Sequence, residues 1–170
     1  AYTGSEPKQM QLVANPNSDE MVLVVNDANE YDYALVWDGS SWGNQRLLAT
    51  STTDDRTDVF AAYEQQSGRA MVVYGKGTDD VYYRLWDGSW GAESMLAGIS
   101  GGYARWTTLA SDPNSNSIVI GVLEDNADVW LAVWNGTGWV NQITATATGS
   151  GTTHPVVAVA FEGMSGQALA

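Results

Sequence analysis

A turn motif rich in tryptophan recurs three times along the chain at nearly constant spacing, and this repetition limits the fold more than any other feature. The three copies begin at Trp37, Trp86 and Trp134, so the spacings are 49 and 48 residues. A fixed period of this size is typical of solenoids, propellers and other arrays of one structural unit. The motif residues are Trp37, Asp38, Gly39 and Trp42 in the first copy, Trp86, Asp87, Gly88 and Trp90 in the second, and Trp134, Asn135, Gly136 and Trp139 in the third.

A second landmark repeats with the same period. The segment at residues 12–18 is similar to that at 109–115, and the segment at 63–70 is similar to that at 161–168. Both offsets correspond to two periods. We therefore expect one repeat array over residues 1–170, with units at about 9–50, 57–98 and 105–147 and a half unit at 155–170.

Each unit is predicted to contain four short strands, which we name A to D in chain order. In the first unit they are expected at about residues 11–15, 21–26, 31–37 and 42–50. Strand B is a nearly continuous apolar run, which is typical of a strand covered on both faces. Asn-Pro-Asn-Ser and similar turns close A to B, and Asp-Gly or Asn-Gly turns close C to D, as tight hairpins prefer. No segment shows a sustained helical period, so helices should be few.

Four antiparallel strands in every unit of about 48 residues are typical of propeller blades. The predicted fold class is all-β, a propeller-like array of four-stranded antiparallel blades with about 3.5 blades present. A β-sandwich is the alternative, which the regular period disfavours. A closed ring needs about four to eight blades. We therefore expect the array to belong to a longer chain, which we favour, or to be completed by another copy.

The Asp-Gly-x-x-Trp hairpin resembles the Asp-box repeat of sialidase-like (bacterial neuraminidase repeat) propellers. The turn motif carries the resemblance, although the copy at residues 87–90 is one residue shorter, and the family's serine is replaced by Val36, Leu85 and Val133. The resemblance implies a propeller in which this turn is a structural device and the catalytic site lies on the other side of the ring. The physical chemistry agrees, because an Asp or Asn side chain can bind backbone N–H groups of its own turn while glycine adopts a positive φ.

Charge and composition exclude several classes of function. Seven Lys and Arg against twenty Asp and Glu give a net charge of −13, which disfavours nucleic acids and anionic membranes as partners. The chain has no cysteine, so disulfides, thiolate metal sites and a cysteine nucleophile are excluded. The single histidine, His154, is expected in an exposed connector. No apolar run is long enough to span a membrane, and no cofactor is expected.

Acidic residues gather in the predicted turns between strands B and C. Asp80 and Asp128 each lie six residues before the motif tryptophan of their unit, and Asp32 lies beside the matching position in the first unit. The simpler interpretation is solvation of the sheet ends. The second is calcium binding by Asp32, Asp80 and Asp128, which is the weaker hypothesis because no Asp-x-Asp-x-Asp-Gly loop is present.

Glycan binding is the more attractive hypothesis for a ligand, because sugars stack on aromatic rings and offer hydroxyl groups to carboxylates. One aromatic position recurs four residues before each motif tryptophan, and connectors add further candidates. The candidate ligand residues are Tyr33, Tyr82, Trp130, Arg56, Arg105 and Trp106. The alternative interpretation of the recurring aromatic position is a place in the core or between blades.

An enzymatic site is not expected, since a sialidase-like site needs an arginine cluster and only Arg56 and Arg105 lie in comparable connectors. The predicted function is a non-enzymatic β-propeller module, extracellular or on the cell surface, with a structural, assembly or adhesion role. The alternative is a carbohydrate-binding, lectin-like propeller, and a glycoside hydrolase is a distant third. The expected partners are other copies of the chain or the rest of a longer chain, and glycans.

Overall fold

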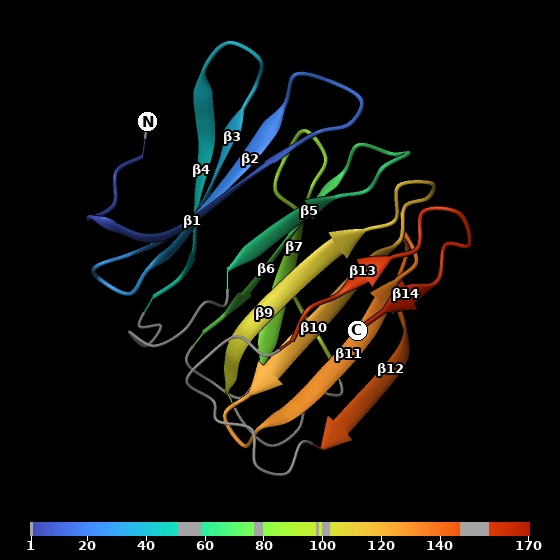
Figure 1. The fold of residues 1–170 in the computed structure, drawn as a ribbon. Coiled ribbons are helices and arrows are strands. Elements are labelled where there is room, and N and C mark those ends of the chain that lie inside the picture. The colour runs from blue at the N-terminus through green and yellow to red at the C-terminus, as the bar shows by residue number, and fades with distance from the viewer. Residues whose placement is uncertain (1, 51–58, 77–79, 98, 100–102, 147–156) are drawn as a thin grey trace.

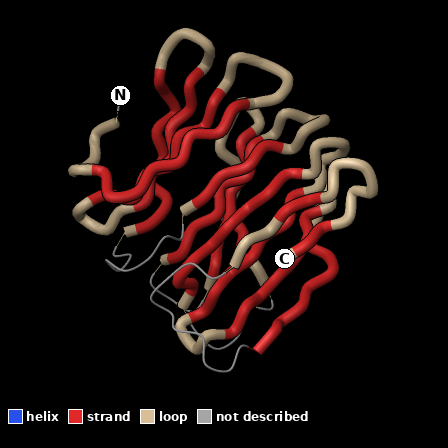
Figure 2. The backbone as a smooth tube through the Cα atoms, in the orientation of Figure 1, coloured by secondary structure: helices blue, strands red, loops and turns tan. Residues whose placement is uncertain are grey.

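The computed structural model describes residues 2–50, 59–76, 80–97, 99, 103–146 and 157–170. Within these residues there are fourteen strands and no helix, and loops and turns join the strands (Figure 2). The strands are β1 (Pro7–Ala14), β2 (Met21–Asp27), β3 (Asp32–Trp37), β4 (Trp42–Ala49), β5 (Phe60–Tyr63), β6 (Ala70–Gly75), β7 (Val81–Trp86), β8 (Ser94–Met95), β9 (Ala104–Ser111), β10 (Ile118–Glu124), β11 (Asp128–Trp134), β12 (Trp139–Thr146), β13 (Ala160–Phe161) and β14 (Ala168–Leu169).

These strands form three four-stranded antiparallel sheets and one two-stranded sheet, each connected in simple sequence order (Figure 1). We call them blade 1 (β1–β4), blade 2 (β5–β8), blade 3 (β9–β12) and the half blade (β13–β14). The first strands of successive blades, β1, β5, β9 and β13, contact one another, so strand A is the innermost strand of each blade. The predicted fold class, a propeller-like array of four-stranded blades with a half blade, is confirmed.

The strand register is the same in all three complete blades. The first residue of strand B lies opposite the motif tryptophan of strand C, as the pairs Met21–Trp37, Ala70–Trp86 and Ile118–Trp134 show. Positions in different blades can therefore be compared directly, and each residue has a structural counterpart in the other units.

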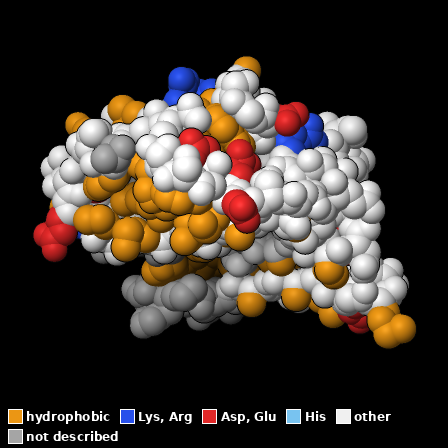
Figure 3. Space-filling view, turned by 90° about the horizontal axis from the view of Figure 1, so that it is seen from above, with side chains coloured by type: hydrophobic (Ala, Val, Ile, Leu, Met, Phe, Trp, Pro, Cys, Tyr) orange, Lys and Arg blue, Asp and Glu red, His pale blue; other side chains and the backbone are white. Residues whose placement is uncertain are grey.

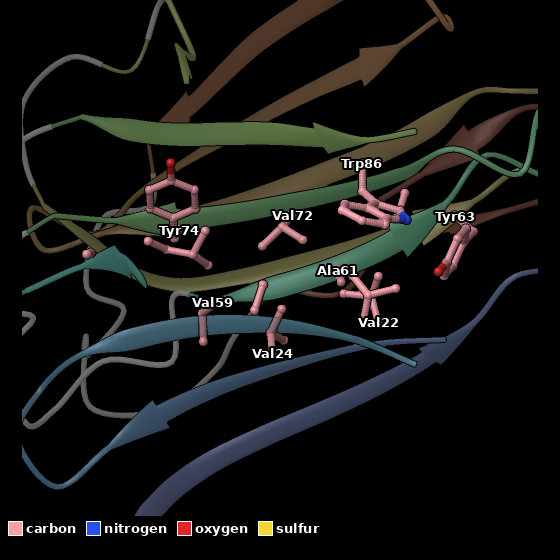
Figure 4. Packing of buried hydrophobic residues seen from close by; sticks show 13 residues of the cluster. Val22, Val24, Val59, Ala61, Tyr63, Val72, Tyr74 and Trp86 are labelled. Carbon is pink, nitrogen blue, oxygen red and sulfur yellow. The ribbon is translucent and has the colours of Figure 1, made fainter. Parts of the chain in front are cut away.

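Blade faces pack against each other to form two hydrophobic clusters. The first joins Val22 and Val24 of β2 to Ala61 and Val72 of blade 2 (Figure 4). The second joins Met71 and the other face of blade 2 to blade 3. Because successive residues of a strand point to opposite faces, a strand between two clusters must be apolar at nearly every position. This explains the continuous apolar runs of strand B.

The turn motif is stabilised as the sequence predicted. Asp38 Oδ1 accepts hydrogen bonds from the backbone N–H groups of Ser40 and Ser41, both at 2.8 Å. Asn135 Oδ1 accepts the equivalent bonds from Thr137 and Gly138 at 3.0 and 2.9 Å. The motif glycines Gly39, Gly88 and Gly136 all have positive φ, between 70° and 94°. In blade 2, where the turn is one residue shorter, strand D is reduced to β8 and an isolated bridge between Trp86 and Trp90.

The hydrogen bonds in this turn predict an unusually acidic side chain. Bonds from the Ser40 hydroxyl and from the backbone of Ser41 and Ser40 lower the pKa of Asp38 from 3.8 to about 2. Because the folded state holds this pKa below its unfolded value, the carboxylate stabilises the fold above about pH 4 and loses that contribution as the pH falls toward 2. We expect an NMR titration of the Asp38 carboxyl carbon to give a midpoint near 2.

Ser40→Ala serves as the matched variant for this titration, because it removes the largest contribution while leaving the backbone donors in place. Its midpoint should move toward 3.8. Equal midpoints in the two proteins would show that the Ser40 hydroxyl does not hold the carboxylate.

Asparagine side chains in the turns between strands A and B link the blades. Asn15 Nδ2 donates to the Gly68 carbonyl at 2.9 Å, the backbone N–H of Gln66 donates to Asn116 Oδ1 at 2.9 Å, and Asn114 Nδ2 donates to the Gly163 carbonyl at 2.6 Å. The sequence predicted Asn15 and Asn114 as turn formers, while Asn116 follows directly after the predicted Asp-Pro-Asn-Ser turn. The structure shows that the same residues also hold each blade to its neighbour.

Hydrophobic side chains are not confined to the interior. Seen from above, they gather in a broad area of the molecular surface (Figure 3). On β1, Met10 and Leu12 are exposed, whereas the counterpart of Leu12 in blade 2, Ala61, is buried against blade 1. Exposed blade faces are thus chemically similar to the faces that pack together inside the array.

Candidate functional site

The recurring aromatic position has a different environment in each blade. Trp130 is only 1% exposed and belongs to the cluster between blades 2 and 3, so its expected role as an accessible ligand residue is wrong. Tyr33 is half-buried beside the ring of Tyr2, with 5.5 Å between ring centroids. Tyr82 is half-buried and lies next to Lys76, whose Nζ atom is 4.4 Å from the ring centroid.

The other candidate ligand residues do not join these aromatics in one site. Arg105 and Trp106 are half-buried on β9, the innermost strand of blade 3. Tyr33 and Tyr82 lie on strand C of blades 1 and 2. Arg56 and His154 fall outside the described residues.

The acidic residues considered for calcium are not brought together. Asp32 is fully buried and accepts a hydrogen bond from Asn26 Nδ2 at 2.8 Å, while Asp80 and Asp128 lie on the other two blades. Within the described ranges, no group of three or more His, Asp or Glu side chains is arranged to hold a metal ion.

A charged cluster that the sequence analysis missed lies on the face of blade 2 that is turned toward blade 1. Glu93, just before β8, is its centre. Glu93 Oε2 accepts a hydrogen bond from the Tyr74 hydroxyl at 2.7 Å and lies 3.4 Å from an Arg84 guanidinium nitrogen, while Lys76 Nζ donates to Oε1. Arg84 also donates to the Gly91 carbonyl at 2.8 Å. We call Tyr74, Lys76, Tyr82, Arg84 and Glu93 the blade 2 cluster.

The blade 2 cluster sits where the packed interface ends and solvent begins. Tyr74 and Trp86, on the same face, are buried against blade 1, and Figure 4 shows the Tyr74 hydroxyl pointing away from Val24 and Val59. The Lys76 and Glu93 side chains remain 31% and 25% exposed. A ligand at this edge could therefore reach a cation, a carboxylate and an aromatic ring together.

Two opposing effects act on the central carboxylate. Burial by itself would raise the pKa of Glu93, but the hydrogen bonds from Lys76 and Tyr74 outweigh it, so the pKa lies below its usual value. Burial together with the bond to Glu93 raises the pKa of Tyr74. Glu93 is thus an ionised acceptor and Tyr74 a protonated donor at neutral pH.

The cluster is specific to blade 2. In the common register, Arg84 corresponds to Leu35 in blade 1 and Ala132 in blade 3, which are both buried apolar residues. Glu93 corresponds to a glutamine in both other blades, Gln45 and Gln142. An alignment of the three units on their motif tryptophans could have revealed the blade 2 cluster. Only the second unit combines a basic residue on strand C with a carboxylate on strand D.

Comparison with known proteins supports the fold. No family model and no curated protein matches the sequence. Among solved structures, the chain is similar to a triple arginine mutant of AofleA from Arthrobotrys oligospora, with a TM-score of 0.59 and 11% identity over 86% of this chain and 46% of that one. It is also similar to the six-bladed β-propeller lectin of Aleuria aurantia, described with a novel fucose recognition mode, with a TM-score of 0.51 and 14% identity over 89% of this chain and 48% of that one.

The chain thus spans about half the length of the two solved structures. At these identities the similarity shows the fold alone. Among the described residues, no helix has the length and apolar character needed to cross a membrane.

Proposed function

We propose that this chain is a non-enzymatic, carbohydrate-binding propeller module that acts outside the cell or on its surface. The observation that carries the proposal is the blade 2 cluster at the open edge of a blade interface. In it, Lys76 and Arg84 both contact Glu93, and Lys76 lies over the ring of Tyr82. Similarity of fold to the lectin of Aleuria aurantia supports it.

The chemistry of the cluster suits a sugar. Glu93 supplies an ionised acceptor, Arg84 and Lys76 supply charged donors, and each can bind a hydroxyl group more strongly than a neutral partner would. The half-buried ring of Tyr82 offers an apolar surface to the C–H groups of a sugar ring. The ligand class that fits this combination is a neutral or weakly charged saccharide.

The proposal predicts a large loss of sugar binding on changing Arg84 or Glu93. A hydrogen bond to a charged group contributes about 1.5–3 kcal/mol, so Arg84→Leu and Glu93→Gln should each weaken binding about tenfold or more. Both changes install residues that the chain already carries at the equivalent positions, Leu35 and Gln45. Binding would be measured by a glycan array, followed by calorimetric titration with the best sugar.

Asp38→Asn is the matched control, because Asn135 shows that asparagine stabilises the same turn. This variant should bind sugar like the unmodified chain. A flat response across the whole glycan panel, or equal binding by Arg84→Leu, would refute the site.

A structural, assembly or adhesion role is the second candidate function. It is favoured by the absence of a matching cluster in the other two complete blades, where Leu35 and Ala132 are buried apolar residues within the described structure. A module with this role would show no sugar binding but would retain the contacts between blades.

A further inference from the structure

A hollow of about 550 Å³ lies between blade 3 and the half blade. Its walls are mainly apolar. One wall comes from blade 3 and the other from the half blade, and the residues that matter here are Leu131, Val133, Ile143, Phe161, Ala168 and Leu169. Ile143 is 59% exposed, so the hollow is open to solvent.

The same wall is covered elsewhere in the molecule. Val133 and Leu131 are only half-buried, whereas their counterparts in blade 1, Val36 and Ala34, are fully buried in the cluster between blades 1 and 2. Trp86, on strand C of blade 2, belongs to that cluster. The face of blade 3 therefore has the chemistry of a surface that strand C of a following blade covers.

The half blade also presents a strand edge. In the described structure, β14 pairs with β13 alone, whereas strand B of every complete blade has strand C on its other side. In each complete blade, the first residue of strand B pairs with the motif tryptophan of strand C. Ala168 is that first residue in the half blade. An open edge of this kind offers its backbone N–H and C=O groups to another strand.

Blade 3 carries a carboxylate at a position that binds the motif tryptophan of the next blade elsewhere in the molecule. In blades 2 and 3, the motif tryptophan donates its indole N–H to a carboxylate of the preceding blade, Trp86 to Glu20 at 2.8 Å and Trp134 to Glu64 at 2.6 Å. Asp112 occupies the position of Glu64 in blade 3. Its Oδ2 atom lies 3.6 Å from the point where a Cβ on Gly166, a residue of the hollow, would stand.

We propose that the hollow is a docking site for a C–D β-hairpin of this same repeat type. Strand C of the hairpin adds antiparallel to β14, with its tryptophan opposite Ala168 and the indole directed toward Asp112. Its apolar side chains fill the hollow against Leu131 and Val133. The three complete blades already share this register, and the proposal stands independently of sugar binding.

The test uses the full chain and a fluorescently labelled synthetic peptide of residues Asp128–Thr146, which contains one complete C–D hairpin. An isolated hairpin is at best marginally stable, so docking should order it. We expect saturable one-to-one binding by fluorescence anisotropy, with a gain of strand signal by circular dichroism. The same peptide carrying Trp134→Ala should bind at least about tenfold more weakly, because it loses both the indole contact and the hydrogen bond.

Two variants of the chain locate the binding. Ala168→Lys places a charge in the occupied hollow, because Ala168 corresponds to Ala70, which is buried against the preceding blade. It should weaken binding about tenfold or more. Met164→Lys changes a fully exposed residue of the half blade that does not line the hollow, and should bind like the unmodified chain. Thermal melts would check that both variants keep their fold.

Absence of saturable binding, or equal affinity of the Ala168→Lys variant, would overturn the proposal. So would a dimer of the chain that the peptide does not dissociate, since a second intact copy would then occupy the face. A dimer that the peptide does dissociate would support it.

Discussion

Glu64→Ala is expected to cost about 3 kcal/mol or more of unfolding free energy, because this fully buried carboxylate joins two blades. Its Oε1 atom accepts hydrogen bonds from Trp134 Nε1 and from the Arg69 guanidinium, both at 2.6 Å. Arg69 in turn donates to the Gly136 carbonyl in the turn of blade 3 at 2.6 Å. Removal of the carboxylate leaves a buried indole N–H without its acceptor and a partly buried cation without its counter-charge.

The matched control is Glu162→Ala, at the equivalent position of the half blade. Glu162 accepts a bond from Ser165 as Glu64 does from Ser67, but it is exposed and has no indole donor among the described contacts. Its removal should change stability by only about 0.5 kcal/mol or less. Urea unfolding of both variants makes the comparison.

A double-mutant cycle isolates the link between the blades. Trp134→Phe keeps an aromatic ring in the cluster and removes the N–H, so its effect should overlap strongly with that of Glu64→Ala. If Glu64→Ala were as mild as Glu162→Ala, or if the two changes were simply additive, the carboxylate would not act as a tie between blades 2 and 3.

The repeat was the part of the fold that the sequence predicted well. The turn around Asp38 depends on local chemistry, namely a side-chain acceptor, a glycine with positive φ and the donors two and three residues later. Such interactions span few residues and are readable from the sequence. The apolar run of strand B was informative for the same reason, since packing on both faces requires it at nearly every position.

The blade 2 cluster was not predicted, because it depends on contacts across strands and not on a local pattern. Arg84 and Glu93 come from different strands, and their meeting requires the register of strand D after a shortened turn. The hydrogen bonds between blades are also non-local. Asn114 binds a residue 49 positions away in the chain, and Glu64 binds one 70 positions away. Composition described these residues only as acidic or turn-forming.

Trp130→Ala is expected to destabilise the fold by about 3–5 kcal/mol, the usual cost of deleting a large aromatic side chain from a packed core. Its ring is 1% exposed and lies in the cluster between blades 2 and 3, at 6.5 Å from the ring of Trp139. Tyr82, at the same position of blade 2, is half-buried at the edge of the other cluster. Tyr82→Ala should therefore cost less than half as much stability.

The proposed sugar site predicts the opposite ranking for affinity, because it assigns Tyr82 to ligand contact whereas Trp130 is buried between blades. Trp130→Phe keeps most of the packing and should retain both the fold and sugar affinity, while Tyr82→Ala should lose sugar affinity although it remains folded. Chemical unfolding and sugar titration of the same two proteins separate these effects. Loss of sugar binding in a folded Trp130→Phe variant would contradict this expectation. It would show that the recurring aromatic position contacts sugar in blade 3 as well, and that Trp130 becomes accessible when the ligand binds.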